Sequence, residues 1–268
     1  NDNIRIVEVC SGQDAGGLQH EYSRYITLSY RWTDEIKRTN LRTENKSKFE
    51  QSIPTNDWPK VYRDAVSIAH QLGVRYLWID SLCIIQDQTE DWLKQAALMG
   101  SIYSGGLLNL AAVECSGLEW LCYRPYDIRK AVDRAPLYKR GWCFQERVLS
   151  RRTVHFGDQL FWELYLQTEN GSRERSVHTF HRRWCSLVRC YSQTELTEPS
   201  DRLIALKGIA SAMASQFRHS PTDYLAGLWK PSIAAQLLWG RESERYSDAD
   251  EVLASQLANH FPSWSWAS

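Results

Sequence analysis

The sequence lacks the features that mark several classes of protein. No apolar run reaches the roughly 18 residues that a membrane-spanning helix needs, and no signal-peptide pattern follows Asn1. Basic and acidic residues number 32 each, so the formal net charge is zero. Basic pairs such as Arg151-Arg152 are short and scattered, unlike the clustered charge of a nucleic-acid-binding surface. We therefore expect no membrane span and no nucleic-acid partner.

The cysteines fit neither a disulfide framework nor a zinc site. There are seven, an odd number at irregular spacing, and no Cys-x-x-Cys pair. His178, His181, Cys185 and Cys190 are close together, but their spacing matches no recognised zinc pattern. Exposed histidines and buried thiols are the simpler interpretation. A reducing, cytoplasmic location is the expectation.

Common cofactor and nucleophile motifs are also missing. The chain has no Gly-x-x-x-x-Gly-Lys phosphate loop, no Gly-x-Gly-x-x-Gly fingerprint and no Gly-x-Ser-x-Gly elbow. A P-loop NTPase, a Rossmann dehydrogenase and an α/β-hydrolase are therefore disfavoured, and no tightly bound cofactor is expected. No loop matches a calcium motif, although carboxylates are plentiful enough to leave regulation by a divalent ion open.

The most informative segment that is present runs from Tyr76 to Asp87. Its apolar first half, Tyr76 to Ile79 and on to Leu82, predicts a strand buried on both faces, as in parallel sheets. Asp80 follows at the carboxyl end of that strand. Ligands bind at this edge of open α/β sheets, so the segment predicts a polar site there.

Strands and helices are predicted to alternate through the first half of the chain. Strands are expected at 25–30, 76–80, 107–113 and 153–156, with helices at 57–73, 87–105 and 141–149. This order predicts an α/β fold with a parallel sheet flanked by helices. Residues 33–57 are expected to be a loop with little core potential, and 114–138 another loop.

The pattern changes after about residue 160. Apolar spacing predicts helices at 184–191, 201–213 and 224–239, so the second half should be mainly helical. We therefore divide the chain into an α/β core, residues 1–160, and a helical extension packed on it, residues 161–268. The chain does not begin with Met and stops abruptly, and we interpret it as a piece of a longer protein.

The segment from Gly141 to Arg147 offers a candidate binding pair. On a helix, Trp142 and Glu146 lie one turn apart and face the same way. An aromatic plane beside a carboxylate suits a sugar or nucleotide, because the ring stacks and the carboxylate accepts hydrogen bonds from hydroxyls. The spacing by itself favours a blander interpretation, a core tryptophan with Glu146 paired to a base such as Arg147.

Several segments together resemble the fungal heterokaryon-incompatibility (HET) domain, which is distantly similar to TIR domains. They include Leu28–Trp32, Tyr76–Asp87, Trp142–Ser150, Pro199–Leu203, Tyr224–Trp229 and Pro262–Trp266. The resemblance implies a TIR-like sheet and a role in triggering cell death when genetically different fungal cells fuse. Trp142-Cys143-x-x-Glu146 is similar to the Trp-Cys-x-x-Glu of TIR domains that hydrolyse NAD⁺, where the glutamate is catalytic.

The resemblance implies an NAD⁺ glycohydrolase with Glu146 as its catalytic carboxylate, NAD⁺ or a related nucleotide as substrate, and nicotinamide and ADP-ribose as products. Arg31 would bind the pyrophosphate, and Trp32 or Trp142 would stack on a base. The further candidates for contacts with the nucleotide are Ser29, Tyr30, Asp80, Cys83 and Gln145.

Two other functions stay open. The chain could be a non-enzymatic module that self-assembles and triggers death through a partner protein, with Glu146 structural. It could also sense a nucleotide without cleaving it. Many TIR enzymes need assembly for activity, so a homo-oligomer with concentration-dependent activity is expected.

Overall fold

A computed structural model describes residues 4–7, 24–113, 132–157, 160–164, 177–238 and 261–267. The chain forms two compact units. The first comprises Asn1–Lys139 and Glu146–Gln167, and the second comprises Arg140–Gln145 and Thr168–Ser268. The division therefore passes through one helix, between Gln145 and Glu146.

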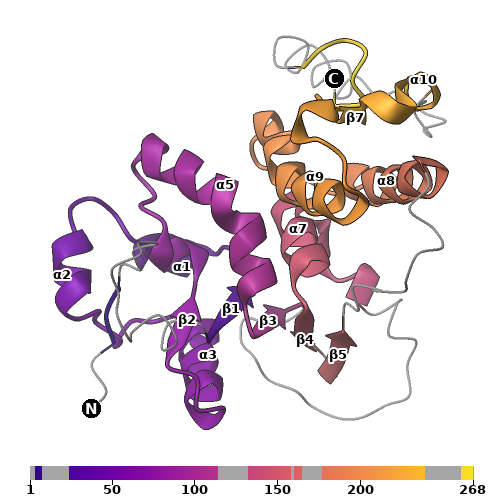
Figure 1. The fold of residues 1–268 in the computed structure, drawn as a ribbon. Helices are drawn as coiled ribbons and strands as arrows, with labels where there is room; N and C mark the ends of the chain where they lie inside the picture. Colours follow the sequence, from indigo (N-terminus) through magenta and orange to yellow (C-terminus); the bar gives the residue numbers. More distant parts are fainter. Residues whose placement is uncertain are drawn as a thin grey trace, which may run out of the picture. The chain divides into compact units, whose positions relative to one another are not determined.

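The first unit is built on a five-stranded sheet in the order β2-β1-β3-β4-β5 (Figure 1). Its strands are β1 (Tyr25–Ser29), β2 (Tyr76–Trp78), β3 (Leu108–Ala112), β4 (Arg152–Phe156) and β5 (Leu160–Leu164). The first four are mutually parallel and β5 runs antiparallel to β4. The predicted parallel sheet and its four strands are confirmed, whereas β5 was not predicted.

Helices connect and flank these strands. In the first unit they are α1 (Asp34–Arg38), α2 (Lys46–Gln51), α3 (Lys60–Gln71), α4 (Asp80–Cys83), α5 (Thr89–Gly105) and the 3₁₀ turn η1 (Pro136–Lys139). Helix α7 (Gly141–Leu149) spans the division between the units. The predicted helices at 57–73, 87–105 and 141–149 are thus confirmed, with α3 beginning three residues later than expected.

The two faces of the sheet differ in chemistry because side chains alternate along each strand. One face is apolar: Ile26, Leu28 and Leu110 share a core cluster with Ala65 and Ala69 of α3. The opposite face carries polar side chains that are nonetheless buried, which are Thr27, Ser29, Asn109, Thr153 and His155. Buried polar groups need hydrogen-bond partners, so we expect the hydrogen-bonded side chains of the sheet to lie on this second face.

Two expectations about the first unit are wrong. Residues 33–57 are not a loop lacking core potential, because α1 and α2 form there and bury Ile36 and Phe49. The expected burial of the second strand on both faces also fails. All three residues of β2 are partly exposed, because β2 is an edge strand.

The second unit is mainly helical, as predicted. It contains α8 (Val177–Ser192), η2 (Pro199–Arg202), α9 (Ile204–Phe217), η3 (Pro221–Asp223), β6 (Tyr224–Leu225), β7 (Leu228–Trp229), η4 (Lys230–Ser232) and α10 (Ile233–Gln236). Aromatic rings join these elements: Phe180 and Trp184 of α8 lie edge-on to Trp229, with ring centroids 5.0 and 5.8 Å away.

The helix predicted at 224–239 is wrong over its first half. Residues 224–229 form a hairpin, in which Tyr224 pairs with Trp229 and Leu225 with Leu228. The two residues of the turn, Ala226 and Gly227, have φ of 43° and 95°. Positive φ at both positions is typical of a tight hairpin turn, which apolar periodicity does not reveal.

Candidate functional site

The carboxyl ends of β1 and β2 are joined by hydrogen bonds to one carboxylate. Asp80 begins α4 directly after β2. Its Oδ1 accepts hydrogen bonds from the Tyr30 hydroxyl and from the backbone N–H of Ser81, the latter at 2.7 Å. Its Oδ2 accepts one from the indole N–H of Trp32 at 2.8 Å. We call Tyr30, Trp32, Tyr62, Asp80 and Ser81 the Asp80 cluster.

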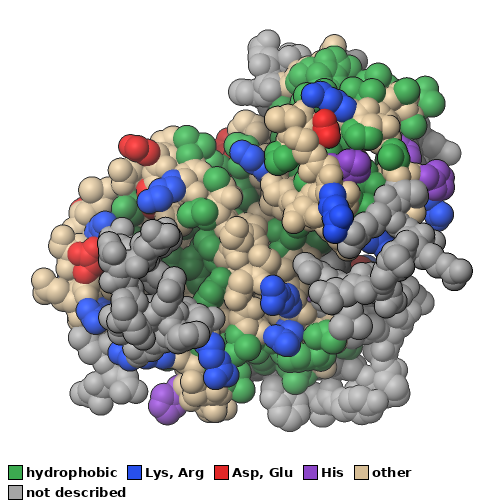
Figure 2. Space-filling model, in the orientation of Figure 1, with side chains coloured by type: hydrophobic (Ala, Val, Ile, Leu, Met, Phe, Trp, Pro, Cys, Tyr) green, Lys and Arg blue, Asp and Glu red, His purple; other side chains and the backbone are tan. Residues whose placement is uncertain are grey.

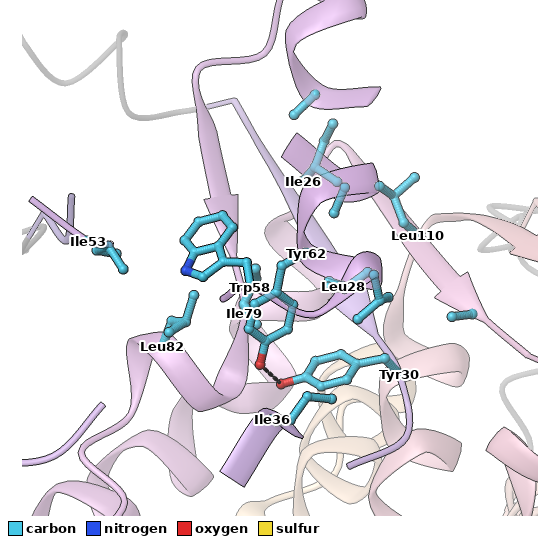
Figure 3. Close-up of a cluster of buried hydrophobic side chains, with 14 of the residues drawn as sticks. Ile26, Leu28, Tyr30, Ile36, Ile53, Trp58, Tyr62, Ile79, Leu82 and Leu110 are labelled. Carbon is cyan, nitrogen blue, oxygen red and sulfur yellow. Dashed lines mark hydrogen bonds between the residues drawn. The ribbon is translucent and has the colours of Figure 1, made fainter. Parts of the chain in front are cut away.

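Three hydroxyls complete this cluster from within the core. Tyr30 Oη lies 2.8 Å from Ser81 Oγ and 3.2 Å from Tyr62 Oη, and Tyr62 also bonds Ser81 Oγ. Figure 3 shows the two tyrosine hydroxyls pointing toward each other among apolar side chains. Burial and then the Asp80 charge raise the pKa of Tyr30 well above its ordinary value. Tyr30 therefore stays protonated and donates to Asp80.

Trp32 and Arg31 lie on the exposed side of the cluster, and the thiol of Cys83 adjoins it. Trp32 is partly exposed and packs with its buried part against the core cluster. Arg31 beside it is exposed, and its side chain makes no hydrogen bond or ion pair among the described residues. Burial, and to a smaller extent the Asp80 charge, raises the pKa of Cys83 to about 11. Cys83 is therefore a neutral thiol near pH 7 and a poor nucleophile.

A second polar group lies between β1 and β3. The Ser29 and Thr27 hydroxyls donate to Asn109 Oδ1 over 3.2 and 3.0 Å, and Asn109 Nδ2 donates to Ser29 Oγ over 3.1 Å. The chain leaves β1 toward β2 on one side and reaches β3 on the other, so the sheet reverses its strand order here. In open α/β sheets of this order, ligands bind at the carboxyl ends of these two strands.

Glu146 lies in α7 as part of the first unit. It is only 6% exposed, an unusual degree of burial for a glutamate. Its backbone carbonyl, in the last turn of α7, accepts hydrogen bonds from the N–H and the hydroxyl of Ser150, at 3.2 and 2.7 Å. The local backbone around this carboxylate is therefore well anchored.

Trp142 and Gln145 belong to the second unit and have partners there. The Trp142 indole N–H donates to Asp201 Oδ2 over 3.2 Å. Gln145 is 1% exposed, and its Oε1 accepts from the backbone N–H of Gly208 over 3.0 Å. The structure thus brings Tyr30, Trp32 and Asp80 into one cluster and gives these two residues separate hydrogen-bond partners.

Sequence reasoning missed a second network of titratable side chains, which links β4, β5, η1 and α7. His155 is fully buried, with Nδ1 2.7 Å from Tyr138 Oη and Nε2 3.0 Å from Glu163 Oε2. Arg147 donates to both oxygens of Glu163 over 2.8 and 3.0 Å, and to Asp133 over 2.8 Å. The polar His155 and Glu163 alternate with apolar neighbours in β4 and β5, and this was the signal in the sequence.

The sequence analysis missed Tyr62 and Ser81 of the Asp80 cluster, and Asn109 of the polar group between β1 and β3. Ser81 follows Asp80 directly, and Asn109 is the polar residue inside the apolar run that forms β3. Those positions were visible in the sequence. Tyr62 gave no signal, because its hydroxyl reaches the site from an otherwise apolar helix face.

Metal-site and membrane-span features are absent from the described part of the chain. No group of three His, Cys, Asp or Glu side chains there could hold a metal ion. None of the described helices has the length and apolarity needed to cross a membrane. On the face drawn in Figure 2, the described Lys and Arg side chains are spread over the surface rather than gathered into one patch.

Comparison with known proteins gives a match to a family model. No curated protein and no solved structure matches the chain. The family model described as Heterokaryon incompatibility protein (HET) matches residues 25–129, which include β1, β2, β3 and the Asp80 cluster. Residues 114–129 of this match lie outside the described part of the chain, and Glu146 lies beyond the match. Over residues 25–129, the chain is therefore similar to the heterokaryon incompatibility (HET) family.

Proposed function

We propose that this protein acts in heterokaryon incompatibility by hydrolysing NAD⁺ to nicotinamide and ADP-ribose, which drains the dinucleotide and kills the cell. The observation that carries the proposal is the carboxyl edge of the sheet around β1. The strand order reverses between β1 and β3, and on the β2 side of β1 the Asp80 cluster presents the ring of Trp32 beside the exposed Arg31. An aromatic face next to a guanidinium suits a base and its phosphates.

The reaction needs little from the protein beyond charge stabilisation. Water adds at C1′ of the nicotinamide ribose while the C1′–N bond breaks. The electron pair of that bond returns to the pyridine nitrogen, so nicotinamide leaves neutral, and the water's proton goes to solvent. The transition state resembles an oxocarbenium ion. The Glu146 carboxylate would accept hydrogen bonds from the ribose hydroxyls and offset the developing positive charge.

Three observations support these roles. Glu146 is buried, and a carboxylate acts more strongly away from water. It belongs to the same unit as the Asp80 cluster. Trp142 belongs to the other unit, so we take Trp32 as the stacking residue.

The test is nicotinamide release from NAD⁺ by purified wild-type protein and by Glu146→Gln, measured by chromatography. Glu146→Gln keeps the side chain's shape and removes its charge, and we expect a loss of about 10²- to 10³-fold in turnover. Glu90→Gln, which changes an exposed glutamate on α5, is the matched control and should keep full activity. Equal rates for the wild type and Glu146→Gln would refute the catalytic role.

A second candidate function is a non-catalytic assembly that triggers death through a partner. It is favoured by β5, where Leu160, Trp162 and Leu164 are 50%, 54% and 47% exposed on one face. Among the described strands β5 pairs with β4 alone, so its outer edge carries backbone groups that a second copy could pair with. Full toxicity of folded Glu146→Gln in fungal cells would favour this function over catalysis.

A further inference from the structure

Both oxygens of the Asp80 carboxylate are engaged inside the protein. Oδ1 receives the Tyr30 hydroxyl and the Ser81 N–H, and Oδ2 receives the Trp32 indole N–H at 2.8 Å. A ligand hydroxyl would have to compete with these donors. The geometry therefore suits Asp80 to orienting its neighbours better than to touching a substrate.

The neighbour whose orientation depends most on Asp80 is Trp32. An indole has a single donor and no acceptor, so pairing its N–H with Asp80 fixes the direction in which the ring points. The side chain of Trp32 packs against the core cluster and remains partly exposed. What remains available to a ligand is the π face, which binds planar rings by stacking.

We propose that Asp80 is a positioning residue that holds Trp32 by its indole N–H, so that the exposed face of the ring stacks on the base of a nucleotide whose phosphates bind Arg31. The inference deepens the proposed function and rests on it. In this proposal the protein recognises the base by stacking. The Asp80 carboxylate accepts hydrogen bonds from protein groups and does not contact the ligand.

The first variant is Asp80→Asn, which keeps the size of the side chain. Its amide oxygen retains the Tyr30 and Ser81 donors, and its NH₂ group then meets the Trp32 N–H, donor against donor. We expect the KM for NAD⁺ to rise about tenfold, the order that stacking contributes. The kcat should change less than about threefold, because stacking serves the ground state and the transition state alike.

A rescue variant separates positioning from a general structural role. Trp32→Phe keeps an aromatic face and lacks the N–H, so the conflict with Asn at position 80 disappears. We expect the double variant Asp80→Asn/Trp32→Phe to have the KM of Trp32→Phe alone, within about twofold, which is a strong departure from additivity. Additive KM effects, with all three variants folded by urea unfolding, would overturn the inference.

A measurement without turnover tests the anchoring itself. The indole N–H resonance of Trp32 in ¹⁵N-labelled protein can be assigned by its loss in Trp32→Phe. Its exchange with water should be slow in the wild type and about tenfold faster or more in Asp80→Asn, because a hydrogen-bonded N–H must open before it exchanges. Unchanged exchange would overturn the positioning role. Wild-type protein that neither binds nor cleaves NAD⁺ would instead overturn the proposed function and the stacking on a nucleotide. The exchange rate of the Trp32 N–H would still test whether Asp80 anchors the ring.

Discussion

Arg147 shows how much one side chain holds together in the first unit. Its guanidinium bonds both oxygens of Glu163 in β5, bonds Asp133, and lies 4.7 Å over the ring of Tyr138. Planar, forked pairing of this kind suits arginine and not lysine. Because Arg147 follows Glu146 directly, the same contacts fix the part of α7 that carries the proposed catalytic carboxylate.

We predict that Arg147→Ala lowers the free energy of unfolding by about 2 kcal/mol, the order expected for losing hydrogen bonds to charged groups. Urea unfolding followed by circular dichroism measures the change. The matched control is Arg134→Ala, an exposed arginine nearby, which should cost less than about 0.5 kcal/mol. Equal effects of the two substitutions would show that the Arg147 contacts contribute little.

Gly227 is the residue that permits the β6–β7 turn. Its φ is 95°, and a Cβ there would lie 2.5 Å from Trp266 Nε1. We predict that Gly227→Ala destabilises the protein by more than the roughly 1–2 kcal/mol that left-handed backbone alone costs an alanine. Gly73→Ala is the control, since Gly73 has φ of 64° and a Cβ added there would have no atom within 4 Å. Thermal unfolding of both variants checks the order, and a larger loss for Gly73→Ala would contradict it.

At the scale of elements, the β4–β5 pair carries a pH dependence. Burial lowers the pKa of His155 below its ordinary value, against an opposing effect of Glu163. Burial alone would raise the pKa of Glu163, but hydrogen bonds from His155 and Arg147 outweigh it and hold the value at about 2. An ionised Glu163 accepts a hydrogen bond from the protonated Nε2 of His155, which leaves Nδ1 to accept one from the Tyr138 hydroxyl.

Both groups bind fewer protons in the folded than in the unfolded state, so stability rises with pH. The His155 contribution should be present above the unfolded pKa of about 6.5 and be lost as the pH falls below it. The Glu163 contribution should be lost between about 4.5 and about 2. We predict that Glu163→Gln flattens the fall of the melting temperature below pH 4.5. A curve parallel to that of the wild type would contradict the assignment.

The sequence predicted the elements whose signal is local. Strand β3 and the helices α3 and α5 were visible as apolar runs and helical spacing, and Gly73, with φ of 64°, follows the end of α3. Helical spacing does not say where the covering core ends, and Leu72, directly after α3, is 54% exposed.

Other features depended on tertiary context. Whether β2 is central or at an edge is decided by strand order, and the short β5 is stabilised by pairing with β4. At the site, Asp80 and Trp32 were named from the sequence, but the hydrogen bond between them joins residues 48 positions apart. No local pattern could predict that Asp80 binds Trp32 within the protein.

At the scale of the whole molecule, the exposed stripe of β5 predicts self-association. Trp162→Ser should lower the apparent mass in light scattering at concentrations where the wild type assembles, because it removes the central side chain of the stripe. Leu72→Ser, which alters an equally exposed residue directly after α3, is the control. Specific activity that falls on dilution in the wild type and is low throughout in Trp162→Ser would link assembly to catalysis. An unchanged mass for Trp162→Ser would contradict the role of β5.

The central claim, the proposal that this protein cleaves NAD⁺ through Glu146, is tested most directly by incubating concentrated wild-type and Glu146→Gln proteins with NAD⁺ and quantifying nicotinamide and ADP-ribose. The account predicts equal amounts of the two products from the wild type and almost none from Glu146→Gln. Absence of nicotinamide from the wild type at every protein concentration, with and without added divalent ions, would contradict it.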